Sequence, residues 1–326
     1  MTYENLALSK AITRALSDEM SACEDVIVLG EDVGKLGGVF RVTDGLYQEF
    51  GPQRVLDTPL GESGIIGTSI GMAMSGLRPV PEIQFDGFVF PAFNQITTQL
   101  AKIRTRSTGQ LSAPVTIRLP YGGAVGAIEH HSESPEAYFA HTPGLRVVVP
   151  SSSHDAYWML RKSIQHPDPV IFMEPKRRYW LKGDVEFSAD DYDPFQAAVV
   201  REGTDLTLVT YGALVPVALA AAEAAVEDGH DIEVIDLRSI SPLDIGTVAD
   251  SVNKTGRAVI VQEASTFVSV SSELSAAVTE QCFYSLEAPV LRVGGFHMPY
   301  PVPRAEEEFL PGIDRILDAI DRSFSY

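Results

Sequence analysis

Short runs of β-branched residues alternate with longer helical patterns in the first half of the chain. Apolar runs bounded by turn residues predict buried strands at 26–29, 80–84, 115–119, 147–149 and 170–173. Apolar positions at helical spacing predict helices at 6–20, 63–75, 90–104 and 155–165. Pro150 and the serines after it mark the start of the last helix, because a serine there can cap it. This alternation favours a parallel sheet with helices on both faces.

Between residues 181 and 197 the alternation gives way to Gly, Asp, Pro and Ser, which indicates a linker. A second alternating set follows it. The predicted strands of this set are 206–211, 232–237, 258–262 and 290–293, and the predicted helices are 213–227, 242–253 and 269–280. We therefore expect an α/β protein with two open parallel-sheet domains, over residues 1–182 and 199–326, joined by a linker at 183–198.

Composition and charge narrow the possible partners. The chain has 326 residues, of which 45% are hydrophobic and 21% charged, as in a folded soluble protein. Its 44 acidic and 25 basic residues give a net charge of −19, which argues against nucleic acid and anionic membranes as partners. Cys23 and Cys282 do not suggest a disulfide framework or a zinc site. Because there is no signal core in residues 1–10 and no run of roughly 20 apolar residues, we expect a cytoplasmic protein.

The first candidate for chemistry is the segment 58–71. A Pro-Leu-Gly turn leads into Glu62, and a helix rich in small residues follows. Gly67, Gly71 and Ser75 are spaced by four, so they share a smooth helix face that another helix can approach closely. Taken alone, Glu62 is a carboxylate at a helix N-terminus, where it can simply cap the helix.

The segment 81–95 follows a predicted strand and is rich in aromatic residues. Phe85, Phe90 and Phe93 are expected to pack in the core. Gln84 and Phe88 lie in the same segment and are the remaining candidates for a site.

The segment 129–141 contains adjacent histidines, His130 and His131, with glutamates beside them. Neighbouring residues of a strand or helix point apart, so this pair is a poor metal site. Filling or capping a loop is the other structural interpretation. A proline at 135 indicates that a helix starts directly after the loop.

These segments together resemble the β subunits of thiamine-diphosphate-dependent 2-oxoacid dehydrogenases. A glutamate, four residues, a glycine and a second glycine four residues later is a pattern of thiamine diphosphate enzymes, and the loop H-S-x-S-P-E-A is that of the branched-chain type. The similarity covers nearly the entire chain, including 233–238, 254–257 and 286–292. It implies a pyrimidine-binding domain followed by a transketolase C-terminal-like domain. At 297–301 the chain has His-Met-Pro-Tyr-Pro where Asp-Thr-Pro-Tyr-Pro is commoner.

The resemblance implies a role for each of five residues. Glu62 would hydrogen-bond a ring nitrogen of the cofactor's aminopyrimidine and favour the imino tautomer, which takes the proton from the thiazolium carbon. Phe88 would stack on the pyrimidine, while Gln84 and Leu60 would contact the cofactor. His131 would contact the reacting intermediate and the acyl acceptor, a role that suits a side chain able to exchange protons near neutral pH.

The same resemblance implies that the chain holds only half of a site. In the family a Gly-Asp-Gly followed by an Asn binds the Mg²⁺ of the diphosphate, and no Gly-Asp-Gly occurs here. An α subunit would therefore supply these ligands in a two-α, two-β heterotetramer, which docks on a dihydrolipoyl acyltransferase core. The turn with Ser163, His166 and Asp168 matches the place where relatives bind K⁺, although animal branched-chain proteins carry Asp and Asn where this chain has His and Asp.

The reaction so implied is oxidative decarboxylation of a 2-oxoacid, followed by reductive acylation of a lipoyl group. Branched-chain 2-oxoacids are the first choice of substrate, because the aromatic motif at 82–93 and the histidine motif at 131–137 together resemble the branched-chain type. Pyruvate, as in the acetyl-transferring pyruvate dehydrogenase, is the alternative, and acetoin a third. Two parallel α/β halves would also suit an NAD-dependent oxidoreductase, but no G-x-G-x-x-G is present. A non-enzymatic docking scaffold is the remaining alternative.

Overall fold

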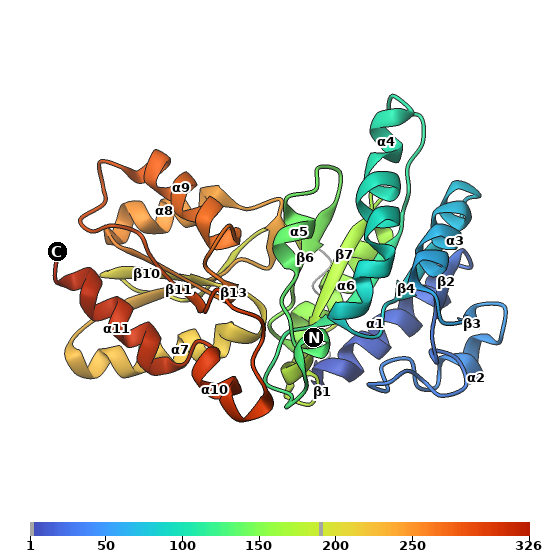
Figure 1. The fold of residues 1–326 in the computed structure, drawn as a ribbon, viewed down its shortest axis with the longest axis horizontal. Coiled ribbons are helices and arrows are strands. Elements are labelled where there is room, and N and C mark those ends of the chain that lie inside the picture. The colour runs from blue at the N-terminus through green and yellow to red at the C-terminus, as the bar shows by residue number, and fades with distance from the viewer. Residues whose placement is uncertain (1–2, 189–191) are drawn as a thin grey trace.

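The computed structural model describes residues 3–188 and 192–326. The first domain is built on a seven-stranded sheet of order β12-β6-β7-β5-β4-β2-β3 (Figure 1). Its strands are β2 (Val26–Gly30), β3 (Val55–Asp57), β4 (Arg78–Glu82), β5 (Thr116–Tyr121), β6 (Arg146–Val148), β7 (Val170–Pro175) and β12 (Ser239–Ser241). Neighbouring strands are parallel except for β12, which pairs antiparallel with β6. The five predicted strands of this half are confirmed, whereas β3 and β12, of three residues each, were not predicted.

Helices cover both faces of this sheet. On one face α1 (Leu8–Ala22) packs against α6 (Ser153–Gln165), because residues such as Leu8, Ile12 and Leu16 form a buried stripe along α1. On the other face lie α3 (Glu62–Met74) and the segment 86–106. Ser152 caps α6, its side chain accepting from the Asp155 N–H, as the sequence predicts.

The second domain has a five-stranded sheet of order β14-β13-β10-β11-β9. Its strands are β9 (Ala198–Arg201), β10 (Leu206–Thr210), β11 (Ile232–Asp236), β13 (Ala258–Ser265) and β14 (Leu291–Gly295). In Figure 1, α8 (Ile245–Thr255) and α9 (Val270–Cys282) lie above this sheet, and α7 (Val215–Ala225) and α11 (Ile313–Phe324) lie below it. Only β9 is antiparallel to its neighbour, so the prediction of two open, mainly parallel α/β sheets is confirmed.

Three features differ from the sequence prediction. β1 (Tyr3–Ala7) pairs antiparallel with β8 (Lys182–Glu186), so a strand lies inside the predicted linker 183–198; residues 189–191 of that linker are outside the described residues. The helix predicted at 90–104 lies within a continuous helical run, 86–106, whose hydrogen bonding changes from 3₁₀ to π and back before the run ends as an α-helix. Phe90, predicted to be in the core, is 39% exposed.

Short helices complete the chain. They are η1 (Asp86–Ala92), η2 (Gln95–Gln99), η3 (Leu100–Lys102), η4 (Glu129–His131), η5 (Lys176–Arg178), η6 (Gly212–Leu214), η7 (Val226–Asp228), η8 (Pro303–Ala305), α2 (Leu46–Phe50), α4 (Ile103–Arg106), α5 (Glu136–Ala140) and α10 (Glu306–Phe309). α5 begins directly after Pro135, as predicted.

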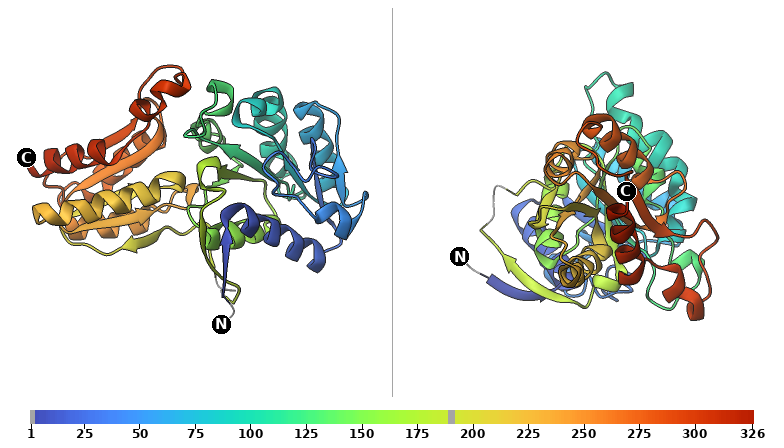
Figure 2. Two further views of the ribbon diagram at one scale, coloured as in Figure 1. Left: turned by 90° about the horizontal axis from the view of Figure 1, so that it is seen from below. Right: turned by 90° about the vertical axis from the view of Figure 1, so that its left-hand side faces the viewer.

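The two domains lie side by side along the long axis of the molecule (Figure 1, Figure 2). One buried apolar cluster runs through both, joining residues such as Leu119 and Phe139 of the first domain to Tyr211 of the second. No helix in the described part of the chain is both long and apolar enough to cross a membrane.

Candidate active site

Glu62, Gln84, Phe88 and His131 all lie at one edge of the seven-stranded sheet. They follow the carboxyl ends of β3, β4 and β5, which with β2 form a parallel block. Loops at the carboxyl ends of parallel strands form the usual ligand-binding edge of an open α/β sheet. The register of the sheet therefore gathers residues that are far apart in the sequence.

Glu62 is the first residue of α3, and its side chain is nearly buried, with 8% of the residue exposed. Its carboxylate accepts no hydrogen bond from any described residue, and the N-cap residue Gly61 provides no side-chain cap. The Gly61 N–H instead donates to Glu31 Oε1 at 3.2 Å. Glu62 thus lies at a helix N-terminus with a carboxylate that no described residue engages as a hydrogen-bond acceptor.

Glu31 connects Glu62 to Gln84. Gln84 Nε2 donates to the Glu31 carbonyl at 3.2 Å and to Asp32 Oδ2 at 3.4 Å. Burial raises the pKa of Glu31 and is the largest effect on it; the Gly61 N–H opposes the rise, while the carboxylates of Glu62 and Asp32 add to it. Glu31 was not among the predicted site residues. Its position directly after a buried strand was the signal that could have identified it.

Phe88 and His131 belong to a second cluster beside the first. The ring of His131 lies 4.1 Å from that of Phe85 and 5.2 Å from that of Phe88, measured between ring centroids. Phe85 was predicted to be a core residue, and it is the aromatic ring nearer to His131. His131 Nδ1 lies 2.9 Å from the His130 carbonyl. Since a carbonyl only accepts, Nδ1 is the donor in this contact, and in the neutral ring Nε2 is then the acceptor.

A buried ion pair between Lys176 and Asp86 holds the backbone around His131. Lys176 Nζ donates to Asp86 Oδ1 and, at 2.7 Å, to the His131 carbonyl, while Asp86 Oδ2 accepts from the Glu133 N–H at 2.8 Å. Burial lowers the pKa of Lys176 and raises that of Asp86, and the charge of each partner opposes the other's shift. Neither residue was predicted to be part of the site.

Leu60 lies in the turn before Glu62 and is 86% exposed. It belongs to no apolar cluster of the described chain. The Leu60 side chain, close in sequence to Glu62, is therefore accessible to a second molecule.

The two histidines do not form a metal site. His130 lies 3.5 Å from Glu129 Oε1 and its ring packs 4.2 Å from that of His131. Across residues 3–188 and 192–326 there is no group of three or more His, Cys, Asp or Glu side chains that could hold a metal ion.

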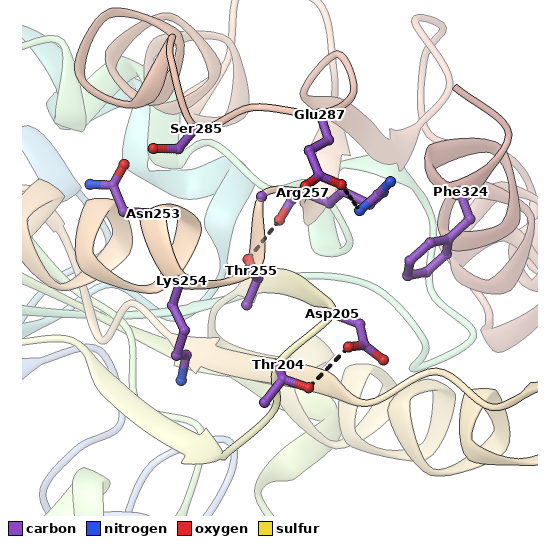
Figure 3. Close-up of a pocket in the computed structure, with 10 residues that line it drawn as sticks. Thr204, Asp205, Asn253, Lys254, Thr255, Arg257, Ser285, Glu287 and Phe324 are labelled. Carbon is purple, nitrogen blue, oxygen red and sulfur yellow. Dashed lines mark hydrogen bonds and ion pairs between the residues drawn. The ribbon is translucent and has the colours of Figure 1, made fainter.

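A cavity of about 430 Å³ lies in the second domain, away from this edge (Figure 3). It is at the amino ends of β10 and β13, and its charged residues already have partners: Arg257 pairs with Glu287, Lys254 pairs with Glu202 and Glu233, and Asp205 accepts from the Asp231 N–H. We assign no role to it, because its charges are satisfied and it lies at the edge opposite to the one where open sheets bind ligands.

Glu136, which follows the His131 loop, is buried in a way that should make the stability of the protein depend on pH. It is buried; Tyr211 OH donates to its Oε1 at 2.7 Å, and its Oε2 has no partner. Burial raises its pKa to about 8. The folded state therefore favours the neutral acid. The contribution of Glu136 to the free energy of unfolding is lost as the pH rises from the ordinary carboxyl range through about 8, by at most about 1.4 kcal/mol per pH unit.

Glu136→Gln should therefore flatten the decline in melting temperature between pH 5.5 and pH 8.5. The neutral amide keeps a carbonyl acceptor for Tyr211 and cannot ionise. Glu280→Gln, an exposed carboxylate on α9, is the matched control and should keep the wild-type slope. Identical pH profiles for wild type and Glu136→Gln would contradict the assignment.

Comparison with known proteins identifies both domains of the chain. Residues 4–180 match the transketolase pyrimidine-binding domain, and residues 196–316 match the transketolase C-terminal domain. The chain is 57% identical over 323 residues to the pyruvate dehydrogenase E1 component subunit beta of Leifsonia xyli subsp. xyli, covering 99% of this chain and 96% of that protein. It is 53% identical over 321 residues to the 3-methyl-2-oxobutanoate dehydrogenase subunit beta of Mycobacterium tuberculosis, covering 98% and 92%.

Among solved structures, a split-gene transketolase described as an inactive beta4 tetramer superimposes with a TM-score of 0.80 over 98% of this chain and 99% of that one. At 22% identity this likeness shows the fold alone. The two domain matches and the two relatives above 50% identity confirm the family predicted from the sequence motifs. The chain belongs to the β subunits of the E1 components of thiamine-diphosphate-dependent 2-oxoacid dehydrogenases.

Proposed function

We propose that the chain is the β subunit of a branched-chain 2-oxoacid dehydrogenase. With an α subunit it would decarboxylate 2-oxoacids oxidatively and acylate lipoyl groups of the acyltransferase. The observation that carries the proposal is Glu62: its carboxylate accepts from no described residue, and it lies at the same sheet edge as His131. A carboxylate that accepts from no described residue, at the ligand-binding edge of the sheet, is available to a donor from outside the chain.

The residues at this edge fit thiamine diphosphate. Glu62 would accept a hydrogen bond from a pyrimidine ring nitrogen, and the half-buried ring of Phe88 offers an apolar face to a flat heterocycle. Gln84, held by Glu31 and Asp32, and the exposed Leu60 would complete the contact. When bound, the cofactor supplies the carbanion chemistry, and the protein supplies its binding and orientation.

His131 would exchange protons with the substrate and with the lipoyl group through Nε2. Its Nδ1 proton is fixed by the His130 carbonyl, and its ring is held between Phe85 and Phe88. A histidine fixed in one tautomer presents a defined acceptor to a reacting group.

The α subunit would hold the remainder of the site. The small-residue face of α3 supports this proposal: Gly71 and Ser75 are exposed, and a Cβ at Gly64 or Gly71 would meet nothing within 4 Å. Such a face permits close helix approach by a partner. The further parts of the proposal are magnesium bound by the α subunit, two α and two β subunits, docking to a dihydrolipoyl acyltransferase core in the cytoplasm, and domain boundaries at 182 and 199.

The proposed potassium site receives no support from the turn 163–169. The Ser163 carbonyl accepts from the His166 N–H, and the Asp168 carboxylate pairs with Arg104. The guanidinium groups of Arg104 and Arg146 both lower the pKa of His166, after burial, which places two positive charges beside the turn. These residues do not fit a cation, and we derive no step from one.

Pyruvate is the second candidate substrate, favoured by the 57% identity to the Leifsonia pyruvate dehydrogenase subunit. Co-expression with the α subunit, followed by steady-state kinetics on 3-methyl-2-oxobutanoate and on pyruvate, tests the proposal. We expect kcat/KM to favour 3-methyl-2-oxobutanoate by at least ~10-fold, since a site selective for branched chains would gain this much from the contacts of the added methyl groups. A preference for pyruvate would assign the chain to pyruvate dehydrogenase. Inactivity on both substrates would contradict the proposal altogether.

A further inference from the structure

The loop that carries His131 is bound to the second domain by two carboxylates. Residues 122–134 connect β5 to α5 in the first domain. Glu263, in β13, accepts from the Gly123 N–H at 2.6 Å and from the Ser134 hydroxyl at 3.3 Å. Glu306, the first residue of α10, accepts from the Ala124 N–H at 2.8 Å and from the Gly126 N–H at 3.2 Å. Three backbone N–H groups of this loop thus donate hydrogen bonds to carboxylates of the second domain.

Tyr300 completes this contact and explains part of the 297–301 motif. Its hydroxyl donates to Glu306 Oε1 at 2.6 Å and lies 3.4 Å from the Ala124 nitrogen. A Cβ built on Gly123 would lie 1.7 Å from the same hydroxyl, so no larger residue fits there. The tyrosine of the motif therefore has a contact in the first domain.

The backbone of the loop is strained in the place where it is held. Ala124 has φ 62°, and Gly122 and Gly126 have φ 85° and 68°. The left-handed conformation disfavours alanine, and such residues persist where the surroundings fix them. Alternating backbone of this kind also turns successive N–H groups toward one anion, which suits the two carboxylates. The strain at Ala124 is consistent with a loop held from outside.

The held segment is continuous with His131. The Gly122 N–H donates to the Glu133 carbonyl at 3.0 Å, and the Ser132 hydroxyl donates to the Ala127 carbonyl at 3.3 Å. These bonds close the loop on itself on both sides of His131. A shift of the segment 123–126 would therefore move the histidine.

We propose that Glu263 and Glu306 are positioning residues for His131, through which the second domain sets the geometry of lipoyl acylation. The proposal rests on the proposed function of His131. Neither carboxylate contacts the histidine itself, and each acts through the backbone of the loop. Both are nearly buried, at 5% and 8% exposure, so their bonds to the loop are shielded from competing water.

The test uses the heterotetramer with Glu306→Ala and Tyr300→Phe, and Glu233→Gln as the matched control. Glu233 is also a buried carboxylate of the second domain that accepts a backbone N–H, from Gly203, but it lies away from the loop. In Glu306→Ala we expect amide hydrogen exchange at 124 and 126 to rise on the order of tenfold, because two charge-assisted bonds are lost. Tyr300→Phe, which removes one hydroxyl, should give a smaller change in the same direction if Glu306→Ala does not fold.

Activity is read as two half-reactions. We expect lipoyl acylation by Glu306→Ala to fall about tenfold, with decarboxylation measured by an artificial electron acceptor and the KM for the 2-oxoacid nearly unchanged. Glu233→Gln should change neither exchange nor activity. Unchanged exchange at 124 and 126, or equal loss of both half-reactions, would overturn the proposal. Full lipoyl acylation by His131→Ala would instead refute the proposed function, whatever the exchange data show.

Discussion

Replacing Glu62 with glutamine is expected to reduce decarboxylation by at least ~10²-fold, since a positioned acid–base group contributes ~10²–10⁴-fold. The amide keeps the size of the side chain and one acceptor oxygen but cannot share a proton with the pyrimidine nitrogen as a carboxylate does. The heterotetramer should still assemble, because the Glu62 carboxylate makes no hydrogen bond within the described chain. The measurement is 2-oxoacid decarboxylation with an artificial acceptor at saturating thiamine diphosphate and Mg²⁺.

If Glu62 were only a helix cap, Glu62→Gln would be expected to change stability and leave activity intact. A carboxylate that only opposes the helix dipole stabilises by about 0.3–1 kcal/mol and has no effect on chemistry. Asp314, in the first turn of α11, is such a residue and serves as the control: Asp314→Asn should keep full activity. Wild-type turnover in Glu62→Gln, with a small loss of stability alone, would return Glu62 to the role of a cap.

Replacing His131 with alanine should separate the two half-reactions. Lipoyl acylation is expected to fall by ~10²-fold or more, because Nε2 is the acceptor left free when Nδ1 bonds the His130 carbonyl. Decarboxylation should fall much less, since Glu62 belongs to the other cluster at the edge. Stopped-flow acylation of a free lipoyl domain, set beside the artificial-acceptor assay, measures the split.

His130 is the natural control for that experiment. It is adjacent to His131, its side chain lies beside Glu129 and has no assigned role, and the substitution keeps the backbone carbonyl that His131 bonds. His130→Ala should retain both half-reactions. Equal loss of the two half-reactions in His131→Ala would contradict its role in acyl transfer.

Patterns that are local in the sequence were predicted well. The strands at 26–29 and 170–173 are continuous apolar runs because both faces of a parallel sheet are covered. β1 and β8 were not predicted, since neither contains an apolar run. The serine cap of α6 was predicted because capping depends only on neighbouring residues.

Contacts that depend on the tertiary fold were not predicted. Lys176 and Asp86 are 90 residues apart, and only the sheet register brings them to the His131 loop. Glu263 and Glu306 lie in the other domain, with no sequence signal linking them to the loop. Phe85 and Phe88 are the same residue type in the same segment, so the sequence does not distinguish them. Their different distances from His131 follow from the path of η1. The motifs located the site, but the residues that hold it required the fold.

The central claim is that this chain holds the pyrimidine half of a cofactor site and that a partner holds the other half. The exposed face of α3 and the exposed Leu60 support this claim. The most direct measurement is calorimetric titration of thiamine diphosphate with Mg²⁺ into this chain alone, the α subunit alone and the assembled complex. We predict saturable binding by the complex and none by either chain alone, with binding by the complex weakened in Glu62→Gln. Binding of equal affinity by this chain alone would contradict the shared site.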